Sequence, residues 1–441
     1  MRENWKSKAG FIFAALGSAV GLGSIWRFPY VVGENGGAVF IFLYILCLFL
    51  IGFPVLIAEI IIGKATQKSP SLAFKKLSNS SLWEKGGLMT LVTGFIISSF
   101  YSVIAGIGFG YLIEAISGNL SNVTSASQAS ATFQALSANP VWCVGFHFFF
   151  LLLALFILFS GVRKGIEVGS KIMMPLLIFV LILLVIKGLS LPSASKGLTF
   201  LFSPDFSSVT PGVFLMALGQ AFFTLSLGQG TMITYGSYLP KKANVLKTLS
   251  IVVLLNTIIA ILMGVAIFTV VFDTGIAPTA GPALLFETLP LVFSQITGGY
   301  WFSILFFLLV TIAALTSEIS ALEPMISYFI DKKNMKRKKA VLITVLGAFI
   351  LGIPSALSFS YLKDLLFHKS FFTLISDLSV NILVPLGGFI AVLLVGWKTK
   401  RHLELLLEDK HKSVRTYFKI TTKYLAPFLI LLILMHLLGV Y

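Results

Sequence analysis

Eleven long apolar segments divide this chain, and they restrict its possible folds more than any other feature. Crossing the hydrocarbon core of a bilayer as a helix takes roughly 20 residues, and each segment has about that length. The chain is 57% hydrophobic and only 11% charged, whereas soluble domains are about a quarter charged. The sequence therefore predicts an all-α polytopic membrane protein with eleven transmembrane helices, at 9–31, 38–63, 88–117, 141–160, 167–190, 211–238, 244–272, 299–329, 338–358, 370–397 and 418–440.

The positive charges alternate between the loops. Twenty-eight of the 33 lysines and arginines lie in the N-terminal tail or in every second loop, and the loops 118–140 and 273–298 have none. By the positive-inside rule, the N-terminus lies in the cytoplasm and the C-terminus outside. This distribution accounts for the net charge of +16 without a nucleic-acid partner, which would need one basic face with stacking aromatics. We expect a protein of the inner (plasma) membrane that contacts the lipid bilayer and has no obligatory protein partner.

The chain contains two cysteines, Cys47 and Cys143, and both lie in apolar segments. Two cysteines allow at most one disulfide and exclude a disulfide framework or a metal cluster. The opening stretch "MRENWKSKAGFIF" lacks a cleavage site of small residues after a short apolar core. We interpret it as a retained cytoplasmic tail that leads into the first helix.

Two of the apolar segments carry signs of a broken helix. The first contains "GSAVGLGSIWRFP" and the sixth contains "TLSLGQGTM". Each glycine lowers helix stability by about 1 kcal/mol relative to alanine, and unpaired backbone groups are tolerated in a bilayer only where protein or a cavity satisfies them. Close helix packing through small residues is the alternative explanation. The two breaks lie five spans apart, which predicts two inverted repeats and a binding site near the midplane.

Further motifs support this interpretation: "ENGGAVF", "GFPVLIAE", "KGIEVGSKIMMP", "GQAFFTLSLGQGTMITYGSY" and "AALTSEISALEP". Together with the first break they resemble the neurotransmitter:sodium symporter family, specifically its bacterial amino-acid transporter branch. The resemblance runs from residue 2 to about residue 440, in order. It implies a single transporter domain over 1–441, with a 5+5 inverted repeat at 9–190 (spans 1–5) and 211–397 (spans 6–10), and one extra helix at 418–440.

The resemblance implies two sodium sites built from oxygen atoms. The first would use Ala19, Ser24, Thr224 and Asn256; the family usually has asparagine at the position of Ser24, and serine reaches less far. The second would use Gly17, Val20, Ala313, Thr316 and Ser317. Taken singly, each hydroxyl could instead bond back to its own helix.

The resemblance also implies where an amino acid would bind. Its carboxylate would meet the amides of the first break and the hydroxyl of Tyr101. Gly21 replaces the aspartate of monoamine carriers, so the substrate should bring its own carboxylate. Gln229 stands where an aromatic residue or methionine is frequent, and it could hydrogen-bond a polar tip. The expected binding residues are Ser18, Ala19, Leu22, Gly23, Ile97, Tyr101, Phe223, Thr224, Ser226, Gln229, Ser317 and Ala321.

Two gates follow from the same resemblance. Arg27 and Asp377 would close the outer end, with Phe223 and Tyr101 as a lid below them. Arg27 alone could instead extend to the interface. The inner gate would consist of Arg2, Trp5, Ser237, Tyr238 and Asp331.

Three acidic residues lie within the apolar segments, and the role of two of them is left open. Glu59 would satisfy amides at the second break. Glu318 and Glu323 flank the ligands of the second sodium site, and they fit either proton coupling or a polar packing network. Chloride use is also left open, because Ala260 is neither the serine of chloride-dependent members nor the carboxylate of many independent ones.

The sequence thus predicts a sodium-coupled symporter that imports a neutral, large hydrophobic or aromatic L-amino acid by alternating access. The alternative is a sodium-dependent ion channel or an amino-acid sensor with the same architecture. An enzyme is not expected, because the chain has no HExxH, no P-loop and no GxSxG, and the G-x-G at 21–23 follows no strand.

Overall fold

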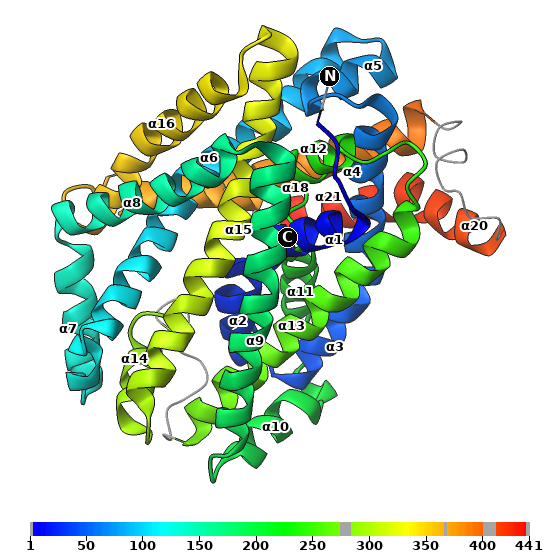
Figure 1. The fold of residues 1–441 in the computed structure, drawn as a ribbon. Coiled ribbons are helices and arrows are strands. Elements are labelled where there is room, and N and C mark those ends of the chain that lie inside the picture. Colours follow the sequence, from blue (N-terminus) through cyan, green and yellow to red (C-terminus); the bar gives the residue numbers. More distant parts are fainter. Residues whose placement is uncertain (1–2, 274–283, 366–367, 400–411, 438–441) are drawn as a thin grey trace.

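The computed structural model describes residues 3–273, 284–365, 368–399 and 412–437. Within these ranges the chain is helical and contains no strand. Long helices run side by side and form the body of the molecule (Figure 1). The uninterrupted ones are α6 (Ser81–Ile116), α8 (Pro140–Phe159), α9 (Val168–Leu189), α13 (Val245–Asp273), α15 (Gly299–Lys333) and α16 (Arg337–Ala356).

Three further spans consist of two α-helices joined by a wider, π-helical turn. They are α3 (Ala38–Cys47) with α4 (Phe53–Thr66), α17 (Phe371–Ser376) with α18 (Val384–Leu393), and α20 (Lys412–Ile420) with α21 (Ala426–Leu437). Shorter helices connect the spans: α5 (Pro70–Ser78), α7 (Ala126–Ser137), α10 (Ala194–Phe202) and α14 (Thr288–Gln295).

Both predicted breaks are present. The first apolar segment is divided into α1 (Lys8–Ala19) and a second helix, Gly23–Glu34, which are bent by 54° at the break between them. The second helix begins with the π-helical turn Gly23–Arg27 and continues as α2 (Phe28–Glu34). The sixth segment is divided into α11 (Pro211–Thr224) and α12 (Thr231–Ser237). In the described part of the chain, nine helices are long and apolar enough to cross a membrane, or ten with the bent pair. Because α11 and α12 are each shorter than a span, the count of eleven stays a prediction.

One helix organises the core. α15 has the largest buried share among the described span-length helices, at 78%, and it packs against α6, α9, α1 and α16. The second half of the sixth segment, α12, packs against α4. Their contact is close because Gly63 and Gly236 face the opposite backbone: a Cβ on Gly236 would lie 2.4 Å from the carbonyl oxygen of Ile60. Helix α4 therefore positions the second break.

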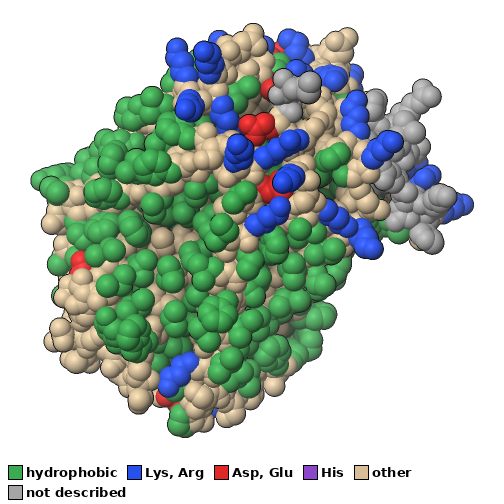
Figure 2. Space-filling view, viewed as in Figure 1, with side chains coloured by type: hydrophobic (Ala, Val, Ile, Leu, Met, Phe, Trp, Pro, Cys, Tyr) green, Lys and Arg blue, Asp and Glu red, His purple; other side chains and the backbone are tan. Residues whose placement is uncertain are grey.

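The surface matches a bilayer. On the face that Figure 2 shows, hydrophobic side chains cover much of the middle of the molecule, and lysines and arginines gather toward the end that carries α5 and the N-terminal segment. Large apolar residues of span-length helices, such as Phe156, Phe179 and Ile350, are exposed. The thiols of Cys47 and Cys143 are both buried and free, so the one disulfide that the sequence allows does not form.

Candidate functional site

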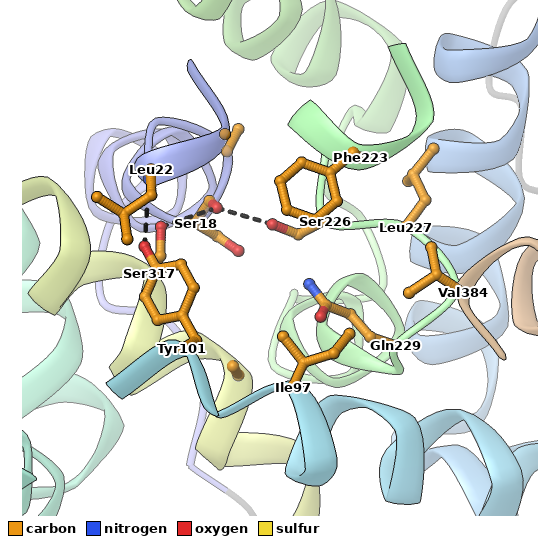
Figure 3. A pocket seen from close by; sticks show the side chains of 14 residues that line it. Ser18, Leu22, Ile97, Tyr101, Phe223, Ser226, Leu227, Gln229, Ser317 and Val384 are labelled. Carbon is orange, nitrogen blue, oxygen red and sulfur yellow. Dashed lines mark hydrogen bonds between the residues drawn. The ribbon is translucent and has the colours of Figure 1, made fainter. Parts of the chain in front are cut away.

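A cavity of about 520 Å³, a volume that includes space open to solvent, lies where the two broken helices meet (Figure 3). Helices α6 and α15 close its other sides, and α18 adds one residue. Every residue that the sequence predicted for amino-acid binding lines it except Thr224. The lining residues are Ser18, Ala19, Gly21, Leu22, Gly23, Ile97, Tyr101, Phe223, Ser226, Leu227, Gln229, Ser317, Ala321 and Val384.

The first break directs backbone groups toward this cavity. The amide of Leu22 donates a hydrogen bond to the Tyr101 hydroxyl at 3.2 Å, and the carbonyl of Ser18 accepts one from the Ser226 hydroxyl at 2.7 Å. Gly21 carries no side chain, and a Cβ there would displace two hydroxyls, since it would lie 2.3 Å from Ser317 Oγ and 2.9 Å from Tyr101 Oη. The wall at this point therefore consists of backbone and hydroxyl groups, without a charge.

The second break is tied to neighbouring helices. Its backbone takes left-handed conformations at Ser226 (φ 53°), Gly228 (φ 76°) and Gly230 (φ 77°). The amide of Gly228 donates to Glu59 Oε1 at 2.7 Å, and Glu59 is fully buried on α4. This contact bears out the role that the resemblance implied for Glu59. The second oxygen of its carboxylate has no hydrogen-bond partner within the described ranges.

Four residues predicted for the first sodium site meet at one hydroxyl. Ser24 Oγ lies 2.8 Å from Thr224 Oγ1, and 3.2 Å from both the Ala19 carbonyl and Asn256 Oδ1. All four residues are buried. Thr224 thus belongs to this cluster rather than to the cavity wall. A carbonyl, two hydroxyls and an amide oxygen are neutral, hard donors of the kind that a hard cation prefers.

The second predicted sodium site lies between α1 and α15. Ser317 Oγ reaches across to the carbonyls of Gly17, at 3.1 Å, and Ser18, at 3.2 Å. The Thr316 hydroxyl instead bonds back to Ala313 O at 2.9 Å, as a hydroxyl within a helix commonly does. A Cβ on Gly17 would lie only 3.0 Å from Thr316 Cβ, so the two helices approach closely. Val20, the remaining predicted ligand, caps α1 through its amide.

Both clusters suit a hard cation better than a transition metal. Their donors are oxygens alone, whereas zinc, copper and iron sites draw on histidine and cysteine. In the described ranges no group of three or more histidine, cysteine or acidic side chains is placed to hold a metal ion.

Beyond Phe223 lies a second cavity of about 590 Å³ by the same measure. It shares Phe223 and Val384 with the first cavity and is also lined by Arg27 and Asn381. Arg27 Nη1 donates to Gln220 Oε1 at 2.5 Å, and its guanidinium lies 5.2 Å from the centre of the Phe223 ring. Asp377, the other half of the predicted outer gate, pairs with Lys369 at 2.9 Å. The structure therefore does not join Arg27 to Asp377.

The N-terminal segment packs against the C-terminal end of α12. The Trp5 indole donates to the carbonyl of Tyr235 at 3.1 Å, and the Trp5 amide donates to that of Tyr238 at 3.1 Å. The Ser237 hydroxyl bonds back to Thr234 O, and Asp331 Oδ2 accepts from the Ser69 amide at 2.7 Å. Arg2, the proposed partner of Asp331, lies outside the described residues.

The two further acidic residues of α15 are held differently. Glu323 accepts from Arg337 at 2.9 and 2.8 Å and from the Tyr238 hydroxyl at 2.7 Å, which is a polar packing network. Glu318 accepts a hydrogen bond from Ser98, and its second oxygen has no hydrogen-bond partner among the described residues.

A model of the sodium:neurotransmitter symporter family matches residues 2–138 and 144–441. The chain belongs to the sodium:neurotransmitter symporter family. A sodium-dependent transporter of Bacillus subtilis, YhdH, described as uncharacterized, is 40% identical over 99% of this chain and 98% of its own. The serotonin transporter of Drosophila melanogaster is 29% identical over 79% of this chain and 63% of its own. The crystal structure of MhsT in complex with L-phenylalanine is 41% identical, with a TM-score of 0.90 over 99% of both chains.

Membership in this family settles the class of function. The symporter is a sodium-dependent, multi-pass membrane transporter of a small-molecule substrate, and it is not an enzyme. Its helical architecture is that of MhsT. The sequence resemblance to the family, drawn from the two broken helices and the motifs around them, is thereby confirmed.

Three residues of the cavity wall are absent from the expected binding set: Gly21, whose position the sequence analysis had considered, and Leu227 and Val384, which it missed. Leu227 lies between two residues that were recognised, Ser226 and Gly228, so the break itself was a usable signal. No signal in the sequence marked Val384, because it is one of many valines in the apolar segments. It reaches the cavity because Gly228 packs directly against the backbone of α18.

Proposed function

We propose that this symporter imports a neutral, large hydrophobic or aromatic L-amino acid together with sodium, by alternating access. The observation that carries the proposal is the position of the cavity. It lies between two broken helices, with the Leu22 amide and the Tyr101 hydroxyl on one side and a buried oxygen cluster at Ser24 nearby. The complex of MhsT with L-phenylalanine supports the same substrate class.

The polar half of the cavity suits an α-amino acid. The carboxylate would face the Leu22 and Gly23 backbone and the Tyr101 hydroxyl, where the start of a half-helix favours negative charge. The ammonium group would meet the carbonyl of Ser18 and the hydroxyl of Ser226. Gly21 brings no acidic group to this part of the wall, and a side chain there would have to displace the hydroxyls of Ser317 and Tyr101. The substrate would therefore supply the carboxylate itself.

Coupling would follow from the neighbouring oxygen clusters. We propose one sodium at Ala19, Ser24, Thr224 and Asn256, where a substrate carboxylate would complete the neutral donor set, and a second at Gly17, Val20, Ala313, Thr316 and Ser317. If sodium favours amino-acid binding, then the amino acid favours sodium binding by the same factor. No chloride site is proposed, since Ala260 offers no polar group.

The gates would act in turn within a 5+5 repeat of residues 9–190 and 211–397, with 418–440 added. The segment around Trp5 would close the cytoplasmic end while the cavity above Phe223 admits substrate. Arg27 and Asp377 would then approach over the bound amino acid, and the contacts of Trp5, Tyr238 and Asp331 with their neighbours would open. The N-terminus would lie in the cytoplasm and the C-terminus outside, in the inner membrane.

Uptake of labelled amino acids into proteoliposomes tests the proposal. An inward sodium gradient should drive accumulation of large neutral amino acids, and dissipating the gradient should abolish it. Uptake that ignores the gradient would contradict the proposal. Sodium flux without any amino acid would favour the channel alternative instead.

A further inference from the structure

Gln229 carries the one side-chain amide among the described residues that line the cavity, and its backbone is packed closely on two sides. It lies between Gly228 and Gly230, whose positive φ angles of 76° and 77° turn the chain at this point. On one side, a Cβ at Gly94 of α6 would lie 2.6 Å from the Gln229 carbonyl oxygen. On the other, a Cβ at Gly228 would lie 1.9 Å from the carbonyl oxygen of Val384. The position of Gln229 is therefore fixed by close backbone packing.

The side chain of Gln229 points into the cavity, beside Ile97 and below Phe223 and Ser226 (Figure 3). It is partly buried, and its amide makes no hydrogen bond to any residue in the described ranges. A carboxamide carries two donor hydrogens and an acceptor oxygen. Since buried polar groups are nearly always hydrogen-bonded, this amide needs water or a ligand as its partner.

Apart from Ser226, whose hydroxyl donates to the Ser18 carbonyl, the labelled residues around the Gln229 amide are apolar. Ile97, Leu227 and Val384 surround the amide, and Phe223 closes the cavity above it. The carboxylate-binding groups at Leu22 and Tyr101 lie on the opposite side (Figure 3). A substrate held by its backbone at that side would extend its side chain toward Gln229.

We propose that Gln229 makes the symporter prefer large neutral amino acids whose apolar side chain carries one hydrogen-bonding group, tyrosine before phenylalanine. This inference rests on the proposed function and adds the polar tip. Tyrosine would place its hydroxyl within reach of the amide. Phenylalanine would displace water from the amide without forming a hydrogen bond to replace it. A site that hydrogen-bonds a substrate group discriminates against the analogue that lacks this group.

Tyrosine and phenylalanine differ by one hydroxyl, so their affinities in sodium test the proposal on the unaltered protein. We expect tyrosine to bind about ten-fold more tightly, the effect of one good hydrogen bond. In Gln229→Met, which keeps the length of the side chain and removes its hydrogen bonds, the preference should fall to about two-fold or less. Gln295→Met, on an exposed residue of α14, should retain the full preference as the matched control.

Equal affinities for the two amino acids in the unaltered protein would overturn the inference. So would a preference for tyrosine that persists in Gln229→Met or, if that variant does not fold, in Gln229→Leu. Both results leave sodium-stimulated binding of large neutral amino acids intact. Loss of sodium-stimulated binding for every such amino acid in the unaltered protein would overturn the proposed function, and this inference with it.

Discussion

The backbone groups exposed at the two helix breaks have different kinds of hydrogen-bond partner. At the first break, the polar groups of Ser18 and Leu22 contact hydroxyls on the cavity wall, namely Ser226 and Tyr101. At the second, the Gly228 amide is bound to a buried carboxylate on α4, and its Cα packs against the backbone of α18. The first break can exchange its hydroxyl contacts for ligand contacts, whereas the second is anchored. The comparison separates residues that bind from residues that hold the site in place.

The largest effect should come from the anchored break. Gly228→Ala places a methyl group 1.9 Å from the Val384 carbonyl oxygen, and rotation of a side chain cannot relieve that overlap. We expect a loss of about 3 kcal/mol or more in folding stability. The thermal unfolding midpoint of the purified protein in detergent measures it.

Gly118→Ala is the matched control for this variant. Gly118 has nearly the same φ, 78°, but nothing lies within 4 Å of its Cβ position. Only the backbone strain of about 1 kcal/mol should remain. Equal destabilisation by the two variants would show that the contact with α18 does not anchor the break.

The second-largest effect on stability should come from Glu59, whose carboxylate binds the same break. Glu59→Ala removes the acceptor of the buried Gly228 amide, which should lower stability by about 1–3 kcal/mol. Glu59→Gln keeps a carbonyl oxygen at this position and should be clearly less harmful. Thermal unfolding of both variants measures the difference. Similar losses in alanine and glutamine variants would mean that the hydrogen bond to Gly228 is not what Glu59 provides.

At the first break, the expected effect is on binding rather than on folding. Tyr101→Phe removes the hydroxyl that accepts from Leu22 and that we assign to the substrate carboxylate. Amino-acid affinity in sodium should fall about ten-fold, with little change in unfolding temperature. Tyr300→Phe is the control, because its hydroxyl also binds a backbone group, Ile116 O, on the outside of the protein. Unchanged affinity in Tyr101→Phe would remove this hydroxyl from the site.

The smallest effect should be at the sodium cluster. Ser24→Ala removes the hydroxyl that contacts Ala19, Thr224 and Asn256. The sodium concentration for half-maximal transport should rise a few-fold, as expected when one neutral hydrogen-bonding group is lost. Ser190→Ala, on an exposed serine after α9, should leave the sodium curve unchanged. An unchanged curve in Ser24→Ala would exclude this hydroxyl as a ligand.

The glycines and hydroxyl residues of the first and sixth segments were sufficient to predict both breaks, because they are unfavourable inside an apolar helix unless its backbone groups are used. Ser226 illustrates this, because its φ of 53° matches the predicted interruption. The individual residues of the cavity wall were predicted from the resemblance to the family.

The rest depends on packing between distant helices. Asp377 forms an ion pair with Lys369, and Glu323 forms one with Arg337. Which charged residues pair depends on the distances between helices, and these distances cannot be read from the order of charged residues along the chain. The same holds for Val384, whose place in the wall follows from the absence of a side chain at Gly228.

Phe223, whose ring lies under the Arg27 guanidinium, forms a wall of both cavities. The ring is thus the partition between the two cavities, and its rotamer decides whether they are separate or continuous. A change at Arg27 or Gln220 that releases the ring would merge the two spaces without any movement of the broken helices.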